Sequence, residues 1–166
     1  MELTIEPIRG HLQIDDAKLL FRNFEGRKED YNDEGDRNFA ILIPTKEMAD
    51  GLMDAGWNVT IKAPREPGDE PFMYLKVKVR FNMYGPSVYL NSNNNPRVLT
   101  EETVGQLDYI KLARVDLDIR PYDWTYRGRT GRTAYLERIH VVQGFDNTDR
   151  FAAMYPELHN GDTLPI

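Results

Sequence analysis

A chain of 166 residues with a formal net charge of −6 is long enough to bury the core of one domain, and its acidity argues against binding polyanions over its whole surface. Because it contains no cysteine, disulfides and thiolate metal sites are excluded, as suits a reducing cytoplasm. There is no signal-peptide pattern and no apolar run near the ~20 residues of a membrane helix, so we expect a cytoplasmic protein without a membrane segment.

The first part of the chain predicts strands interrupted by one helix. Residues 17–24 (AKLLFRNF) predict the first strand, and residues 37–43 (RNFAILI) predict a more buried second strand. Thr45 can cap a short helix that ends just before Gly56. Residues 57–62 (WNVTIK) predict a further strand.

A long strand is predicted by strict alternation in residues 73–81 (MYLKVKVRF), which follow a loop rich in proline and glycine. One face of this strand is apolar and expected to pack on the core. The opposite face consists of Tyr74, Lys76, Lys78 and Arg80. A basic strand face therefore lies on the surface of the predicted sheet.

The remaining elements are shorter or less regular. Residues 91–97 (NSNNNPR) indicate a loop, and Thr100 can cap a short second helix. Residues 114–120 and 133–142 predict the last two strands, with a β-bulge near residues 137–138, where the apolar phase slips.

This order of elements predicts a mainly β fold, an OB-fold-like five-stranded barrel with one or two short helices and an inserted segment after the second strand. We expect residues 1–150 to form this single domain. Residues 151–166 have no clear period and predict a loosely packed C-terminal tail.

Residues that could support catalysis or bind a metal are sparse. The acidic loop at residues 30–35 (DYNDEG) resembles a calcium loop, but its twelfth position is Ile41, where a glutamate is required. The three histidines lack zinc-binding spacing. Asp116 and Asp118 share a strand face, which leaves a nuclease as a remote alternative. We predict no catalytic residue, no metal and no cofactor.

Basic and aromatic residues are concentrated in residues 120–143 (RPYDWTYRGRTGRTAYLERIHVVQ), while residues 25–36 carry six acids and two bases. The segment Gly128 to Gly131 predicts a hairpin turn, because two glycines supply turn residues. Turn formation does not require the arginines around it. They indicate either a solubilising tip or a binding surface.

Three segments combine cations with aromatic rings, as proteins that bind single-stranded nucleic acid do. The candidate contacts are Arg22, Phe24, Arg27, Lys28 and Tyr31 after the first strand; Tyr74, Lys76, Lys78 and Arg80 on the long strand; and Arg120, Tyr122, Trp124, Tyr126, Arg127, Arg129 and Arg132 in the hairpin. In an OB-fold the first and last groups would lie on the two loops that flank nucleic acid.

Residues 21–43 (FRNFEGRKEDYNDEGDRNFAILI) and the ending VDLDIRPYDW…GRTGRTAYLERIHVVQ resemble phage-encoded single-stranded-DNA-binding proteins of the small OB-fold type. The resemblance implies binding of single-stranded DNA without sequence preference, to protect it in phage replication or recombination, with replication or recombination proteins as further partners. It also implies an acidic tail, which residues 151–166 match poorly, with Glu157 and Asp162 as their acids. The alternative is a protein-interaction or structural module whose Arg/Tyr patch binds an acidic protein.

Overall fold

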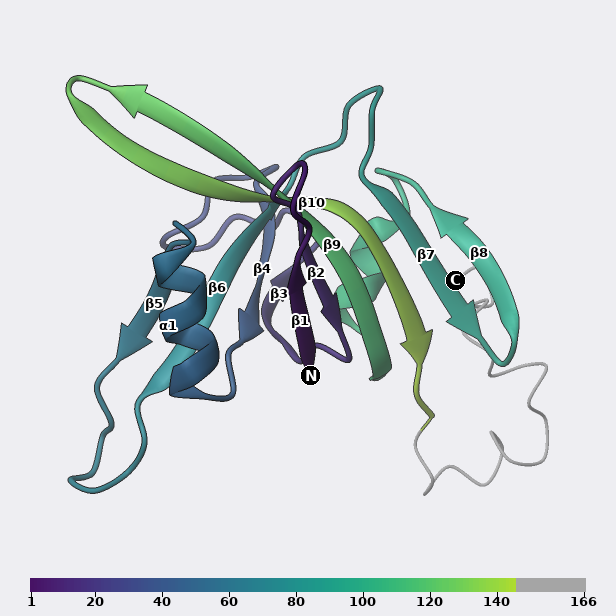
Figure 1. Ribbon diagram of the computed structural model, residues 1–166. Coiled ribbons are helices and arrows are strands. Elements are labelled where there is room, and N and C mark those ends of the chain that lie inside the picture. The colour runs from purple at the N-terminus through teal and green to yellow at the C-terminus, as the bar shows by residue number, and fades with distance from the viewer. Residues whose placement is uncertain (146–166) are drawn as a thin grey trace.

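A ten-stranded sheet with one α-helix and one short 3-10 helix makes up residues 1–145, the part of the chain described by the computed structural model (Figure 1). The strands are β1 (Glu2–Ile5), β2 (Leu12–Asp15), β3 (Leu19–Asn23), β4 (Arg37–Leu42), β5 (Val59–Lys62), β6 (Phe72–Val79), β7 (Ser87–Ser92), β8 (Asn95–Leu99), β9 (Leu112–Tyr126) and β10 (Arg129–Gln143). The helices are α1 (Lys46–Asp54) and η1 (Val104–Asp108). The predicted tail and residues 146–150 lie outside the described residues.

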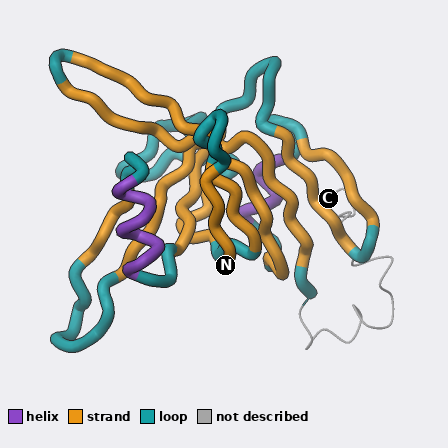
Figure 2. The backbone as a smooth tube through the Cα atoms, viewed as in Figure 1, coloured by secondary structure: helices purple, strands orange, loops and turns teal. Residues whose placement is uncertain are grey.

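The strand order confirms a mainly β protein and differs from the predicted five-stranded barrel. Hydrogen-bonded neighbours follow the path β1-β2-β9-β10-β6-β4-β3, with β5 added to β6 and the β7–β8 pair added to β10. Strand β10 runs parallel to β6 and β7, and the other pairs are antiparallel. Strands dominate the fold in Figure 2. Within the described residues the sheet is open, because its path has two ends.

The core lies where alternating apolar side chains of β6, β9 and β10 meet. In β6 the predicted alternation is confirmed: Met73, Leu75, Val77 and Val79 are buried, whereas Lys76 and Lys78 are exposed. A buried aliphatic side chain of this size contributes about 1.5–3 kcal/mol to folding. The same alternation therefore fixes the register that holds the basic face of β6 outward.

The strand predicted at residues 17–24 is confirmed as β3 (Leu19–Asn23), but it is the third strand and not the first. Strands β1 and β2 precede it and make an antiparallel pair in which Glu2 is opposite Asp15. Strands of four residues are too short to give a periodic signal.

The helix prediction is confirmed: the Thr45 side chain accepts a hydrogen bond from the Met48 amide at 3.2 Å, and α1 follows.

Two further predictions in the second half need correction. Residues 91–97 are not a loop but the end of the β7–β8 hairpin, whose turn residues Asn93 and Asn94 have φ of 52° and 63°. Positive φ at both central residues is the requirement of a type I′ hairpin turn, and asparagine tolerates it. The second helix is one 3-10 turn that follows Thr103, not a helix capped by Thr100. The predicted bulge is confirmed by the register shift between Leu136 and Arg138.

The outer half of the β9–β10 hairpin projects from the sheet and is called here the hairpin arm (residues 122–132; Figure 1). Its turn consists of Arg127 and Gly128, with φ of 51° and 76°, between the paired residues Tyr126 and Arg129. The turn is therefore shorter than the predicted segment, and Gly131 lies within β10. This places two arginines at the tip of the arm.

Candidate nucleic-acid interface

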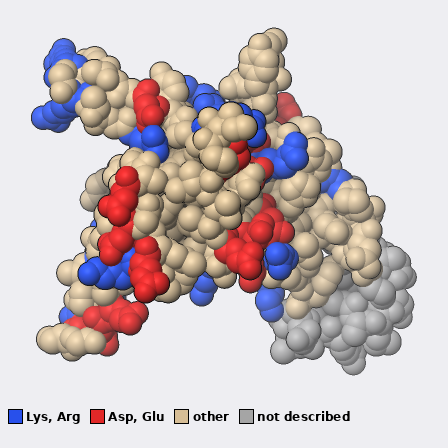
Figure 3. Space-filling model, viewed as in Figure 1, with Lys and Arg blue, Asp and Glu red and all other residues tan. Residues whose placement is uncertain are grey.

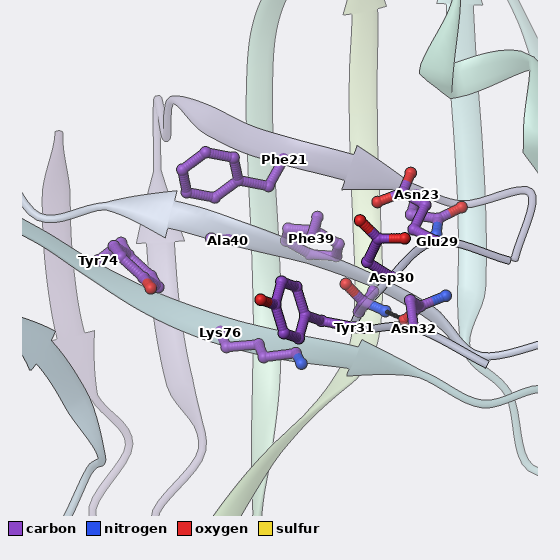
Figure 4. A pocket seen from close by; sticks show the side chains of 11 residues that line it. Phe21, Asn23, Glu29, Asp30, Tyr31, Asn32, Phe39, Ala40, Tyr74 and Lys76 are labelled. Atoms are coloured by element: carbon purple, nitrogen blue, oxygen red, sulfur yellow. Dashed lines mark hydrogen bonds between the residues drawn. The ribbon is translucent and has the colours of Figure 1, made fainter. Parts of the chain in front are cut away.

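A groove on the outer face of β3, β4 and β6 brings aromatic and basic side chains together. Its first part is a cavity of about 410 Å³ whose walls include Phe21, Tyr31, Tyr74 and Lys76, together with the acids Glu29 and Asp30 (Figure 4). Tyr31 projects from the loop after β3 with 99% of its surface exposed. The predicted residues Tyr31, Tyr74 and Lys76 thus meet at one site, although they come from two distant segments.

Aromatic rings at one end of this cavity form a cluster of three. Phe21 packs edge-on against Tyr74, with ring centroids 5.6 Å apart, and against Phe72 at 6.3 Å. The Phe21 ring is still 65% exposed. Rings with one supported and one exposed face are the platforms on which bases stack.

Phe21 was missed by the sequence analysis because its orientation depends on a backbone irregularity. It has φ of 52°, in the left-handed region that a bulky residue rarely adopts, and the register of β3 against β4 shifts between Leu20 and Asn23. A regular strand alternates its side chains between two faces, whereas this bulge turns Phe21 outward. The run of apolar residues in AKLLFRNF gives no sign of the bulge.

Two smaller cavities continue the groove across β6. One of about 230 Å³ has Tyr31, Lys76, Lys78 and Arg80 in its walls, with the acids Asp36 and Glu101. Another of about 190 Å³ lies between Lys76, Lys78 and Arg132. Lys76 borders all three cavities. The three cavities together are called the groove below. The basic face predicted for the long strand is its floor.

The predicted contacts differ widely in exposure. The exposed ones are Lys28, Tyr31, Lys76, Lys78, Arg80, Tyr122, Trp124, Tyr126, Arg127 and Arg129. Half-buried are Arg22, Arg27, Tyr74, Arg120 and Arg132. Phe24 is fully buried and stacks on Phe39 at 5.0 Å, so its ring is part of the core and has no free face for a base. The expectation for Phe24 is corrected for this reason.

Two of the predicted arginines hold the loop after β3 in place. Arg22 donates hydrogen bonds to the carbonyl oxygens of Leu107 and Ile110, at 2.7 and 2.8 Å. Arg27 binds the buried carboxylate of Asp108 at 3.2 Å. These contacts fix the loop that carries Tyr31, and they occupy both guanidinium groups.

Arg132 joins the base of the hairpin arm to α1. It makes a bidentate ion pair with Asp123, at 2.6 and 3.0 Å, and donates to the Ala55 carbonyl oxygen at 2.8 Å. Its guanidinium also lies over the Trp57 ring, 5.1 Å from the centroid. The hydrogen bond from Arg132 holds the pKa of the Asp123 carboxyl below its ordinary value. Arg132 is thus a structural contact at the edge of the groove.

The other side chains of the hairpin segment form two groups. At the base, Arg120 lies over the Tyr135 ring at 4.8 Å, and Tyr122 packs edge-on against the same ring at 6.0 Å. Further out, the remaining aromatic and basic side chains are exposed: Trp124, Tyr126, Arg127 and Arg129. Figure 3 shows basic side chains at the tip of the arm and acidic ones over α1. The acidic segment 25–36 lies elsewhere, beside the groove, where Glu29 and Asp30 line the first cavity and Asp36 lines the second.

Other kinds of site find little support in the described residues. Within residues 1–145 there is no group of three or more His, Asp or Glu side chains that could share a metal ion. Asp116 accepts hydrogen bonds from the Asp16 amide at 2.9 Å and from Arg114 at 3.1 Å. These contacts indicate that the Asp116 carboxylate stabilises the fold. In the same part of the chain no helix is long and apolar enough to cross a bilayer.

Exposed aromatic rings beside cations on a β-sheet are the features with which proteins bind single-stranded nucleic acid. The family model described as the putative phage ssDNA-binding domain matches residues 4–165, and the chain belongs to this family. This confirms the resemblance stated from the sequence, and it favours a DNA-binding protein over an enzyme or a protein-interaction module.

Solved structures with a similar fold include those of one phage protein. The single-stranded DNA-binding protein from bacteriophage Enc34 is 11% identical, with 92% of this chain and 98% of that chain covered and a TM-score of 0.53. The structure of the Enc34 protein in complex with ssDNA is 14% identical, with 82% and 88% covered and a TM-score of 0.52. A comparison with curated proteins found no significant match.

Proposed function

We propose that this protein binds single-stranded DNA without sequence preference along the groove and the hairpin arm. Membership in the phage ssDNA-binding family supports the ligand, and one observation supports the location: Lys76 connects three cavities that carry aromatic rings at one end and Arg132 at the other. The floor of the groove carries the cations Lys76, Lys78 and Arg80, whereas its walls also contain the acids Glu29, Asp30, Asp36 and Glu101. The local field along the cationic floor, and not the net charge of −6, therefore determines binding there.

Bases stack on the exposed rings of Phe21 and Tyr31 and on the half-buried ring of Tyr74 in this proposal, while Lys76 and Lys78 face the phosphates. Each stacked base contributes about 1–3 kcal/mol, and every base has a π-face, so stacking carries little sequence preference. Ion pairing with phosphates adds affinity that is also independent of sequence. The site therefore suits a protein that covers single strands during phage replication or recombination in the host cytoplasm.

We also propose that the fold is an expanded OB barrel in which β2 and β3 act as two halves of one bent strand. Strand β2 pairs with β9 and β3 pairs with β4, and the Ala17 amide between them bonds the Val115 carbonyl oxygen at 2.8 Å. If β2 and β3 are counted as one strand, the five barrel strands correspond to β2/β3, β4, β6, β10 and β9. The loop that carries Tyr31 and the hairpin arm then take the positions of the two binding loops.

The test is anisotropy of a labelled oligothymidylate at three salt concentrations. Lys76→Ala/Lys78→Ala should reduce the slope of log affinity against log salt by about 1.4, since each lost phosphate contact on a single strand removes about 0.7. Lys46→Ala/Lys111→Ala, which removes two exposed lysines outside the groove, is the matched control and should bind like the parent. Equal slopes for parent and Lys76→Ala/Lys78→Ala would show that the groove does not hold the strand.

A further inference from the structure

A fourth cavity, of about 470 Å³, adjoins the groove on the far side of Arg80 and is not used by the site described above. It lies between the turn before β2, the loop that joins β6 to β7, and the base of the hairpin. Its charged and aromatic walls are Arg9, His11, Arg80, Tyr84, Arg120 and Glu137. Only Arg80 and Arg120 were among the residues that the sequence indicated.

Cations outnumber acids in this cavity. Its one carboxylate, Glu137, is paired with Arg120 at 3.6 Å. Arg9 contacts Glu6 of its own turn at 3.4 Å, but its side chain is 64% exposed and has room to reach a ligand. Figure 3 shows basic side chains gathered at this edge of the molecule, between the hairpin arm and the β6–β7 loop. The cavity is therefore suited to an anion.

The fourth cavity is continuous with the groove. Arg80 lines both this cavity and the second part of the groove, next to Lys78. Tyr135, which also lines the second part, supports Arg120 at 4.8 Å. A polyanion that leaves the groove along Lys76, Lys78 and Arg80 meets Arg120 and Arg9 next.

The β6–β7 loop adds an aromatic ring at the rim. Tyr84 is 87% exposed, yet its backbone is ordered: its amide donates to the Asn82 side chain at 2.8 Å, and the Asn82 amide donates to the Gly85 carbonyl oxygen at 2.8 Å. A ring presented to solvent on a fixed turn has the form of a stacking platform.

We propose that the fourth cavity is a second strand-binding segment, in which Arg9 and Arg120 hold a phosphodiester of the DNA leaving the groove and Tyr84 stacks on one of its bases. The proposal rests on the proposed function and extends it. The bound strand is longer than the groove alone accommodates, and it bends around Arg80 toward the β6–β7 loop.

The experiment compares oligothymidylates of about 6 and about 16 nucleotides, which span the usual range of site sizes for one such domain. On the longer one, Tyr84→Ala should weaken binding roughly five- to a hundred-fold with an unchanged salt slope, and Tyr84→Phe should restore it. Arg9→Ala should lower the slope by about 0.7. On the shorter one, which the groove accommodates, these variants should bind like the parent. Arg65→Ala, which removes an exposed arginine from the β5–β6 loop, is the charge-matched control.

Each outcome separates the two proposals. If the parent binds neither oligonucleotide, the proposed function is wrong and this extension falls with it. If the parent binds both and the Arg9 and Tyr84 variants match it on the longer one, the groove stands and the extension is wrong. Equal losses on both lengths would also contradict it, because the fourth cavity would then not be an added segment. Thermal melts of each variant establish that the fold is intact.

Discussion

The Trp124 indole covers Gly131 on the opposite strand of the hairpin arm, so that a Cβ at position 131 would lie 2.3 Å from the ring atom Cζ2. Glycine inside a strand ordinarily weakens it, but here the ring takes the place of the missing side chain. Trp124 remains 38% exposed. One face of the indole is thus supported and the other is available to a ligand.

Trp124→Ala should lower the affinity for single-stranded DNA by about 1–3 kcal/mol and leave the salt slope unchanged, because a stacking contact carries no counterion release. The melting temperature should change little, since the ring packs on the arm and not on the sheet core. Titrations at three salt concentrations and thermal melts measure both quantities. Thr130→Ala, an exposed change on the same arm, serves as the control. A large loss of stability would assign Trp124 to the core instead.

The two arginines at the tip, Arg127 and Arg129, should contribute to DNA binding, whereas Arg132 should contribute to stability. Arg127→Ala/Arg129→Ala should reduce the log–log salt slope by about 1.4 without affecting stability, because both side chains are exposed. Arg132→Ala should lower the free energy of unfolding by about 1–3 kcal/mol, because it removes charge-assisted hydrogen bonds to Asp123 and to the Ala55 carbonyl oxygen. Anisotropy and chemical denaturation measure the two effects. A tip variant with the parental slope would mean that the arm does not touch the strand.

The ion pair between Asp123 and Arg132 should make stability depend on pH in the acid range. The hydrogen bond from Arg132 lowers the pKa of Asp123 in the folded protein, so the stabilisation is complete above the unfolded pKa of about 3.9 and is lost as the pH falls through the lower folded value. The difference in melting temperature between the parent and Asp123→Asn should be constant from about pH 5 to about pH 8 and shrink below about pH 4. Asp50→Asn, an exposed carboxylate on α1, is the control. A difference that persists at low pH would assign the effect of Asp123→Asn to something other than charge.

Sequence patterns predicted those parts of the molecule in which side-chain alternation and burial coincide. Residues 73–81 alternate strictly, so both the strand and its basic outer face follow from period two. Thr45 likewise predicts the start of α1, because a cap depends on local hydrogen bonds. These features need no knowledge of what packs nearby.

Other parts depend on contacts that no local pattern contains. Phe21 is exposed although Leu19 and Asn23, which have the same parity in the strand, are half-buried and buried, because a bulge lies between Leu20 and Asn23. The sequence places Arg132 next to the arginines of the tip, but in the structure it donates hydrogen bonds to Asp123 and to the Ala55 carbonyl oxygen at the end of α1. The open ten-stranded order likewise depends on short strands that give no periodic signal.

Phe21 allows binding and stability to be separated. Its φ of 52° costs a bulky residue about 1–3 kcal/mol, whereas glycine adopts this conformation freely. Phe21→Gly should therefore leave the free energy of unfolding nearly unchanged or raise it, because relief of strain offsets the loss of the contacts with Tyr74 and Phe72. Affinity for single-stranded DNA should nevertheless fall by about 1–3 kcal/mol, because one stacking platform is removed.

The matched control for Phe21→Gly is Asn94→Gly, which also places glycine at an exposed residue of positive φ, in the β7–β8 turn. Asn94→Gly should keep the parental affinity, so that any loss in Phe21→Gly is due to the ring and not to the more flexible backbone. Denaturant titrations measure the free energy of unfolding of both variants, and oligonucleotide anisotropy measures their affinity for single-stranded DNA. If Phe21→Gly binds as tightly as the parent, the aromatic cluster of β3 and β6 is not where bases stack. If it instead unfolds much more easily, the three rings stabilise the sheet more than the backbone of Phe21 strains it.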